Sequence, residues 1–375
     1  MRILYISNSI IPSRTANSIH VMKMCQAFAD NGHNVILLAP DIKKGYEKNT
    51  GNIYKYYGVK KNFIINKLWC PNIKGNFIFF TFSIFLYLLV NKHFHLVYGR
   101  FLHGCYVAAL LKKNVILELH DNIFNKKKHI VIIFKRLIKS KFLKKVVVIS
   151  KALKKIYLKN KYLNKDNIQV AHDGADEVKK FKCDLKLKGR KRSLKLGYVG
   201  HLYKGKGMEI ISKIANKLDK DIEIHIVGGI EKDIKFWKNQ ISSKNIYFYG
   251  FIPHNKTSNY IKALDVCLLP NQKIVHPHGA DPSDITVNIS SFTSPLKLFE
   301  YMAHKKPIIA SDLPVLREVL NKKNSILVSC DDLEKWIEAI NKLKDLKKRK
   351  QIATKALKDF SKYSWKNRAL LIIGS

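Results

Sequence analysis

Short apolar segments alternate with amphipathic segments along almost all of this 375-residue chain, and the alternation occurs twice. In the first series, an amphipathic stretch that begins at Ile19 ends at Asn31-Gly32, a typical helix stop. The apolar runs of this series lie at 3–6, 35–40, 96–99, 115–120 and 146–150. Buried strands separated by amphipathic helices indicate a parallel sheet covered by helices. The first half is therefore predicted to be a doubly wound α/β domain.

The second series follows residues 181–193, a stretch rich in Lys and Arg that has no apolar periodicity. Its strand-like runs lie at 194–200, 222–229, 246–252, 266–270, 307–311 and 326–329. We interpret 181–193 as a linker between Rossmann-like domains over 1–180 and 194–355. Such sheets bind ligands at the carboxyl ends of their strands, so two facing edges would form a cleft suited to a two-substrate transfer reaction.

The chain is strongly basic, with 69 Lys and Arg residues against 28 Asp and Glu residues. Lysine accounts for 60 of the basic residues and arginine for 9, while Ile and Asn are also abundant, a composition typical of A/T-rich codon usage. Sites that recognise bases or phosphates by bidentate hydrogen bonds favour arginine. The net charge of +41 therefore does not by itself indicate a nucleic-acid partner, and we expect none.

The most basic segment, residues 126–165, holds 15 Lys and Arg residues and no Asp or Glu. Lysines interleave there with Ile, Leu and Phe, as in helices that lie on anionic membrane surfaces. A solvated face inflated by codon usage is the competing interpretation, and nucleic-acid binding is a third one that lacks a recognisable motif. We favour an anionic membrane surface, to which the apolar run 77–90 would add apolar contact.

The apolar run 77–90 has 14 residues, fewer than the ~20 that span a bilayer, so it predicts a buried or interfacial helix. A strand-like run follows Arg2 directly, and no secretory signal is visible. Six scattered cysteines without a CxxC pair favour reduced thiols over a zinc site or disulfides. We expect a cytoplasmic protein, peripheral on the inner face of the cell membrane. No metal is expected, although one loop holds the ligand types His276, His278, Asp281 and Asp284.

Two segments of the second half combine features of anion sites. Residues 197–207, GYVGHLYKGKG, place glycines with Lys204 and Lys206 at a strand-to-helix junction, where backbone N–H groups favour an anion. Further along, Thr293-Ser294-Pro295 is typical of a helix entrance, with hydroxyls at cap positions and proline near the first turn. Glu300 lies about two turns later and could accept hydrogen bonds from ribose hydroxyls. Each segment taken alone is also compatible with an ordinary turn or an exposed helix.

The order of motifs along nearly the whole chain resembles that of GT-B-fold, retaining glycosyltransferases of family 4, the glycosyl transferases group 1. The matching segments are 19–40, ELHD (118–121), 146–155, 170–176, 197–207, 248–270, 293–314 and YSWKNRA (363–369). Their order and spacing carry the resemblance more than any single motif. The resemblance implies an acceptor-binding domain, a nucleotide-sugar-binding domain that faces it across a cleft, and a C-terminal helix, 356–375, that returns to the first domain.

The resemblance also implies a role for each motif residue. His120, Lys206 and Glu300 would be the catalytic residues: His120 contacts the transferred sugar, Lys206 contacts the diphosphate, and Glu300 holds the ribose. The implied donor-binding residues are Gly200, His201, Lys204, Lys206, Gly228, Phe251, Ile252, Thr293, Ser294, Leu296, Lys297 and Glu300, of which Phe251 and Ile252 border the nucleobase. On the acceptor side, the implied residues are Asn17, Ser18, His20 and Asp121.

Two positions depart from the family pattern. The family usually carries a pair of glutamates eight positions apart, but Phe292 stands eight residues before Glu300, which leaves the donor sugar open. We expect Lys297, on the same helix face as Glu300, to replace part of the missing function. The arginine usual after the phosphate-loop glycine is His201 here, and Lys204 is expected to supply the lost charge.

The implied function is retaining transfer of a sugar from a nucleotide-diphosphate sugar to a lipid-linked or membrane-associated glycan acceptor in surface-polysaccharide biosynthesis. Lys206 and helix amides would stabilise the charge that develops on the leaving diphosphate, which could itself take the proton of the acceptor. No cofactor is expected besides the nucleotide sugar. A soluble glycosyltransferase with a small-molecule acceptor and an inactive nucleotide-sugar-binding protein are the alternatives.

Overall fold

The computed structural model describes residues 1–43, 45, 47, 50–275 and 288–374. The chain divides into two compact units. Unit 1 consists of Met1–His172 with Trp365–Ser375, and unit 2 consists of Asp173–Ser364. The predicted limits, 1–180, 194–355 and 356–375, differ from this division. Residues 173–193 belong to unit 2, and residues 356–364 of the predicted returning helix also belong to unit 2.

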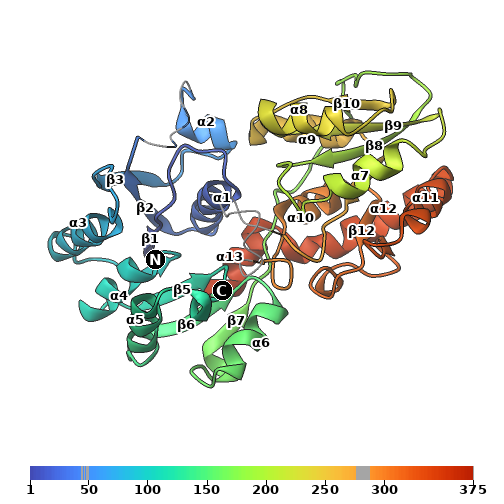
Figure 1. Cartoon of the computed structure of the whole chain (residues 1–375). Helices are drawn as coiled ribbons and strands as arrows, with labels where there is room; N and C mark the ends of the chain where they lie inside the picture. Colours follow the sequence, from blue (N-terminus) through green and yellow to red (C-terminus); the bar gives the residue numbers. More distant parts are fainter. Residues whose placement is uncertain (44, 46, 48–49, 276–287, 375) are drawn as a thin grey trace. The chain divides into compact units, whose positions relative to one another are not determined.

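Unit 1 contains a parallel sheet of seven strands in the order β3-β2-β1-β4-β5-β6-β7 (Figure 1). The strands are β1 (Arg2–Ile6), β2 (Asn34–Asp41), β3 (Ile64–Trp69), β4 (Leu96–Gly99), β5 (Val115–Leu119), β6 (Leu143–Val148) and β7 (Ile168–Val170). Five of these strands were predicted from the apolar runs. The two edge strands were missed, because β3 is partly exposed on both faces and β7 has only three residues.

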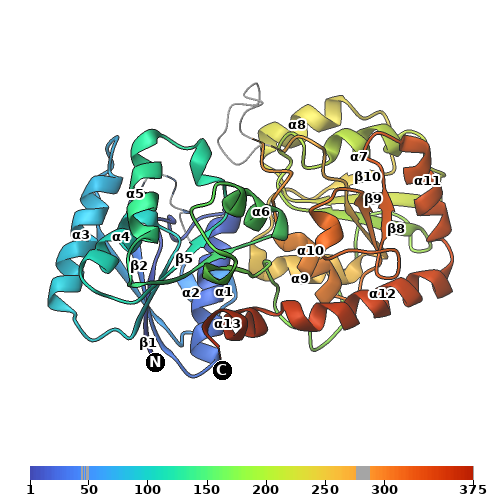
Figure 2. The same ribbon diagram turned by 90° about the horizontal axis from the view of Figure 1, so that it is seen from below.

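Helices cover both faces of this sheet. They are α1 (Ala16–Asp30), α2 (Ile53–Tyr57), α3 (Phe77–Val90), α4 (Leu102–Leu110), α5 (Lys128–Ile138), α6 (Lys151–Lys159) and α13 (Trp365–Ile373). The Thr15 hydroxyl caps α1 by accepting from the Ser18 amide, and the helix ends at Asn31 as predicted. On one face α13 packs against α1, and on the other α4 packs against both α3 and α5 (Figure 2). Every described helix is too short or too polar to cross a membrane.

Unit 2 contains a parallel sheet of six strands in the order β10-β9-β8-β11-β12-β13. The strands are β8 (Leu194–Val199), β9 (Ile222–Val227), β10 (Ile246–Phe248), β11 (Val266–Leu269), β12 (Ile308–Ser311) and β13 (Ile326–Val328). All six were predicted. The direction of strand order reverses between β8 and β11, and doubly wound sheets bind their ligands at the carboxyl ends of the strands beside such a reversal.

The helices of unit 2 are α7 (Met208–Ala215), α8 (Glu231–Asn239), α9 (His254–Ala263), α10 (Leu296–Ala303), α11 (Leu333–Lys342) and α12 (Leu346–Phe360). Short 3₁₀ turns lie at Ile123–Asn125, Lys165–Asn167, Leu316–Glu318 and Ser361–Tyr363. Within unit 2, α7 packs against α11 and α10 packs against α12. Aliphatic side chains of the central strands, such as Leu196 and Ile224, form the core with Trp336 of α11.

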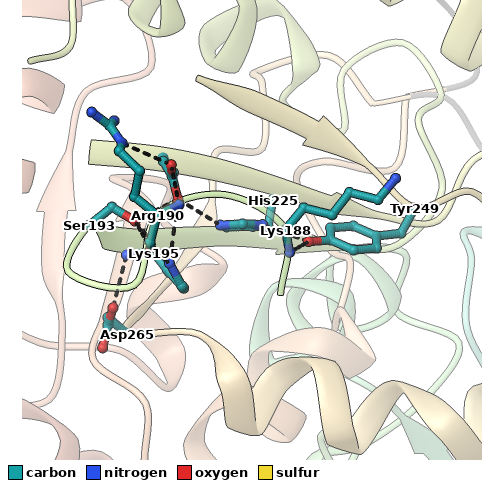
Figure 3. A network of polar contacts seen from close by, with 8 residues as sticks. Lys188, Arg190, Ser193, Lys195, His225, Tyr249 and Asp265 are labelled. Carbon is teal, nitrogen blue, oxygen red and sulfur yellow. Dashed lines mark hydrogen bonds and ion pairs between the residues drawn. The ribbon is translucent and has the colours of Figure 1, made fainter. Parts of the chain in front are cut away.

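The end of the predicted linker is anchored to β9 by a polar network around Glu223, which is almost fully buried (Figure 3). The Glu223 carboxylate accepts hydrogen bonds from the Ser193 hydroxyl at 2.5 Å and from the Arg190 amide at 3.0 Å. Burial opposes its ionisation, but these hydrogen bonds outweigh burial and lower the pKa of Glu223 to about 2. Residues 190–193 are therefore part of unit 2 and not a free linker.

Candidate functional site

The ends of β8, β9 and β10 lie together in unit 2, on one side of the reversal of strand order. The Gly200 amide, just after β8, donates to the Val227 carbonyl at 2.9 Å, and the Gly228 amide donates to the Gly250 carbonyl at 2.8 Å. A Cβ atom at Gly228 would lie 2.1 Å from the Gly200 carbonyl oxygen, and Gly228 has a φ of +123°. Only glycine therefore allows this approach. Phe251 and Ile252 follow Gly250 directly and are half-buried, so the loop predicted to border a nucleobase lies beside the glycine loop.

Lys297, on the first turn of α10, points its ammonium group toward this glycine loop. Its Nζ lies 3.7 Å from the centre of the Tyr198 ring, and a Cβ atom at Gly200 would lie 2.8 Å from it. The Nζ atom is buried and has no hydrogen-bonding partner among the described residues. Burial, reinforced by the positive charge of Lys206, lowers the pKa of Lys297 well below its usual value. The prediction that Lys297 acts beside Glu300 stays a prediction, but its side chain reaches the Gly200 loop.

Lys206 provides a second, half-buried cation in the same region. Burial lowers the pKa of Lys206 to about 8. Burial lowers the pKa of both lysines, and the charge of Lys206 adds to this effect at Lys297. A bound phosphate would offset the cost of desolvating these two cations, so the arrangement suits an anion. Lys204, in contrast, is exposed.

Binding of a nucleoside diphosphate is expected to weaken as the pH rises above about 8. Lys206 of the free protein loses its proton there, whereas the diphosphate is already fully ionised above about pH 7. A bound anion raises the lysine pKa again, so binding takes up a proton in this range. Titration calorimetry with uridine and guanosine diphosphates from pH 7 to 10 would measure the decline.

The control for this pH dependence is Lys206→Arg, because a guanidinium keeps its charge over the whole range. This variant should bind with a flatter pH profile than the natural protein. An equally flat profile for the natural protein would contradict the assignment of Lys206 to the phosphates.

The entrance of α10 differs in detail from the prediction. Pro295 occupies the N-cap position, not the first turn, and provides no side-chain cap to the helix. Ser294 is buried, and its hydroxyl accepts a hydrogen bond from the Asp173 amide at 3.0 Å. Thr293 is half-buried. The first amides of α10, including that of Leu296, are thus not capped by the predicted hydroxyls, and they suit an anion.

Glu300 lies on the same helix, five residues after Pro295. Its Oε1 lies 2.6 Å from Nε2 of His254, the first residue of α9. This pairing holds the half-buried Glu300 carboxylate in one orientation. A carboxylate held in this way can accept hydrogen bonds from hydroxyl groups. Phe292 is buried, so an apolar side chain withdrawn from solvent stands where the family usually has its first glutamate. His201 stacks on Tyr203 with ring centroids 4.9 Å apart, and its carbonyl accepts from the Tyr198 hydroxyl.

Unit 1 has a buried polar cluster at the end of β5, centred on Glu118. His120 Nε2 lies 2.6 Å from Glu118 Oε1, and His20 Nε2 lies 3.2 Å from the same oxygen. The Arg368 guanidinium donates to Oε1 at 2.7 Å, and the Tyr98 hydroxyl donates to Oε2. Burial opposes ionisation of Glu118, but Arg368 and the two histidines outweigh it and hold its pKa well below its usual value.

The predicted acceptor-side residues do not all join this cluster. His20 does, with its ring 4.8 Å from that of His120. The Ser18 hydroxyl instead donates to the backbone of the residues that precede α1, and Asn17 is half-buried with an unpaired Oδ1 among the described residues. Asp121 is partly exposed and forms an ion pair with Lys126 at 2.8 Å.

Two groups of residues bear on metal binding. His20, Glu118 and His120 are of types that bind divalent metals. The Arg368 guanidinium already neutralises the Glu118 carboxylate, which disfavours a further cation at that oxygen. The loop cluster His276, His278, Asp281 and Asp284 lies outside the described residues.

Sequence reasoning missed four residues of these sites: Tyr198, His254, Glu118 and Arg368. Glu118 had a readable signal, because a charged residue inside the apolar run VILEL must find a buried partner. It also lies two residues before His120, on the same face of the strand. The other three are brought to their sites by pairing between distant segments, which no local pattern reveals.

Two family models match the chain. Residues 18–179 match the model for Glycosyltransferase Family 4, and residues 193–345 match the model for Glycosyl transferases group 1. The chain is 27% identical over 364 residues to MJ1069 of Methanocaldococcus jannaschii, an uncharacterized glycosyltransferase, covering 90% of this chain and 88% of the relative. The chain belongs to the group 1, family 4 glycosyltransferases.

Solved structures show the same fold. HepE of Anabaena, in complex with UDP, matches with a TM-score of 0.72 and 13% identity over 99% of this chain and 98% of HepE. The lipopolysaccharide outer core galactosyltransferase WaaB matches with a TM-score of 0.65 and 15% identity over 99% of both chains. These likenesses confirm the predicted fold class, GT-B, and at such identities they concern the fold alone.

Proposed function

We propose that this glycosyltransferase transfers a sugar from a nucleotide-diphosphate sugar, with retention of configuration and without a metal, to a lipid-linked glycan acceptor in surface-polysaccharide biosynthesis. One observation carries the donor assignment: the buried Lys297 ammonium, which has no hydrogen-bonding partner among the described residues, lies next to the Gly200 loop, and the half-buried Lys206 belongs to the same region. Two lysines that are withdrawn from solvent at the ligand edge of a doubly wound sheet suit a diphosphate. The UDP held by HepE, a protein of the same fold, supports this donor class.

The chemistry of the site fits catalysis by charge stabilisation. As the bond between sugar and diphosphate breaks, negative charge develops on the leaving phosphate oxygen. Lys206, Lys297 and the first amides of α10 would stabilise that charge. The leaving phosphate oxygen would accept the proton of the acceptor hydroxyl, which attacks the same face of the sugar. Glu300, oriented by His254, would hold the ribose hydroxyls.

Residues of unit 1 would serve the sugar and the acceptor. The hydrogen bond from His120 to Glu118 holds the imidazole ring in place, and we propose that His120 contacts the transferred sugar. A membrane-associated acceptor is supported by the basic segment 126–165 and by the name of WaaB, a lipopolysaccharide galactosyltransferase of the same fold. A peripheral position on the inner face of the cell membrane follows from this proposal.

The proposal is tested by a screen of nucleotide sugars. We expect one donor class to raise the melting temperature and to release its nucleoside diphosphate in the presence of lipid extract, with activity retained in a chelator. NMR of the product should show the anomeric configuration of the donor. Lys206→Ala and Glu300→Ala should each lower turnover by about 100-fold or more without unfolding the protein.

Lys213→Ala is the matched control, because Lys213 is an exposed lysine on α7 that has no role in the proposed site. Its turnover should equal that of the natural protein. Turnover retained by Lys206→Ala would overturn the diphosphate assignment. The absence of turnover with every donor, despite binding, would favour an inactive nucleotide-sugar-binding protein.

A further inference from the structure

Helix α3 presents an apolar face to the outside of unit 1. Its inner face is formed by the buried residues Phe80, Ile84 and Leu88, four residues apart. On the opposite face, Ile78 is 60% exposed and Phe82 is 55% exposed, and the stripe continues through Leu86 to Val90. Polar residues normally occupy the outer face of a surface helix, so a helix that is apolar all round is normally buried.

Neighbouring residues extend this stripe into a larger surface. Strand β3, which packs against α3, is an edge strand and exposes Ile64 and Trp69 by 56% and 61%. The resulting α3 patch consists of Ile64, Trp69, Ile73, Ile78, Phe82, Leu86, Leu89 and Val90. Figures 1 and 2 both show α3 at the outer edge of its unit. Exposed apolar side chains gathered on two elements that pack together mark a site of interaction.

The α3 patch adjoins the basic segment 126–165. Phe77, at the start of α3, stacks on His129 of α5 with ring centroids 6.4 Å apart. The exposed face of α5 carries Lys128 and Arg136, with Ile132 exposed between them by 42%, and the exposed Lys139 directly follows the helix. The chain has no Asp or Glu between Glu47 and Glu118, so the segment that contains α3 and β3 carries no negative side chain.

We infer that the α3 patch inserts into the surface of an anionic lipid bilayer while the basic face of α5 contacts the lipid headgroups. This inference rests on the proposed function and names the surface by which the enzyme reaches a membrane-associated acceptor. An apolar helix face flanked by lysines fits an interface that is apolar inside and negatively charged outside. A helix of 14 residues lies in the plane of such an interface and does not cross it.

Charge favours a bilayer over a second copy of this chain. A symmetric dimer joined through the α3 patch would place the same positively charged surface of each copy near that of the other. Without an intervening acidic residue, this arrangement is repulsive. The anionic headgroups of a bilayer instead complement the positive charge of α5, and they would surround the whole α3 patch.

The test uses the full-length protein and vesicles of phosphatidylcholine with or without phosphatidylglycerol. The variant Ile78→Gln/Phe82→Gln/Leu86→Gln removes the centre of the patch. Its matched control is Ile230→Gln/Phe236→Gln/Leu346→Gln, which changes the same three residue types at similarly exposed positions of unit 2 (47%, 57% and 54%). We expect the natural protein and the control to bind anionic vesicles in flotation and the patch variant to bind about tenfold or more weakly.

A second measurement reports insertion directly. Trp69 is the exposed tryptophan of the chain, whereas Trp237, Trp336 and Trp365 are buried. Brominated lipids should therefore quench the fluorescence of the natural protein on anionic vesicles, and Trp69→Phe should lose this quenching while still binding. High salt should weaken binding, because the headgroup contacts are electrostatic.

Equal vesicle binding by the patch variant and the natural protein would overturn the inference. Equal binding of the natural protein to neutral and anionic vesicles would also overturn it. A third contradicting result is light scattering that shows the natural protein to be a dimer and the patch variant a monomer, while both bind vesicles equally. Binding of uridine or guanosine diphosphate is measured for all three proteins. It tests the donor site of unit 2 separately, so a failure of membrane docking is distinguishable from a failure of the proposed function.

Discussion

Replacement of Lys297 by methionine is expected to weaken binding of the nucleoside diphosphate by roughly 10- to 100-fold, the loss of one charge-assisted hydrogen bond. The same substitution should raise the melting temperature of the free protein, because methionine fills the space without the cost of desolvating an ammonium group. Each kcal/mol of desolvation cost that is removed should raise the melting temperature by about 2–4 °C. Calorimetry with uridine and guanosine diphosphates measures the first effect, and differential scanning calorimetry measures the second.

The opposite signs of these two effects distinguish a binding role from a structural one. A lysine that served packing or stability would lower the melting temperature when replaced, as most core substitutions do. Lys213→Met, on the exposed face of α7, should change neither quantity. A Lys297→Met protein that binds as tightly as the natural protein, or melts at a lower temperature, would contradict the role of Lys297 as a phosphate ligand.

Replacement of Arg368 by methionine is expected to lower the free energy of unfolding by about 3–5 kcal/mol, because it leaves the buried Glu118 carboxylate without its guanidinium partner. Both side chains are almost fully buried, so water cannot substitute for the lost partner. Chemical denaturation followed by circular dichroism measures this loss.

A double-mutant cycle separates the ion pair from packing. Adding Glu118→Gln to Arg368→Met removes the uncompensated charge and should restore part of the stability. Arg317→Met serves as the control, because Arg317 pairs with Asp312 at the surface and its loss should leave the melting temperature nearly unchanged. If Arg368→Met proved as mild as Arg317→Met, the Glu118 cluster would not be the buried ion pair described above.

Most of the fold was readable from the sequence because the central strands of both sheets are buried on both faces. Such strands appear as continuous apolar runs, and all six strands of unit 2 were predicted in this way. The partly exposed β3 and the three-residue β7 carry no comparable signal. The division into units also departed from the predicted limits, since Arg190 and Ser193 look like linker residues until Glu223 supplies their partner.

The candidate site was only partly readable for a related reason. Glycines and lysines at a strand-to-helix junction suggested an anion site, and the structure brings Gly200, Gly228 and Lys297 together there. Whether a lysine is exposed, as Lys204 is, or buried beside an aromatic ring, as Lys297 is, depends on contacts between β8 and α10 that are about 100 residues apart in sequence. The approach of His254 to Glu300 depends on packing in the same way.

The position of α13 has a consequence for how this protein is made. Unit 1 includes the last eleven residues, Trp365–Ser375, and Arg368 reaches back across 250 positions in sequence to Glu118. During synthesis, the Glu118 carboxylate therefore has no guanidinium partner until Arg368 has been added to the chain. The segment of unit 2, in contrast, is complete once Ser364 has emerged. We therefore expect unit 2 to be able to fold before unit 1, whose core lacks this ion pair until α13 has been synthesised.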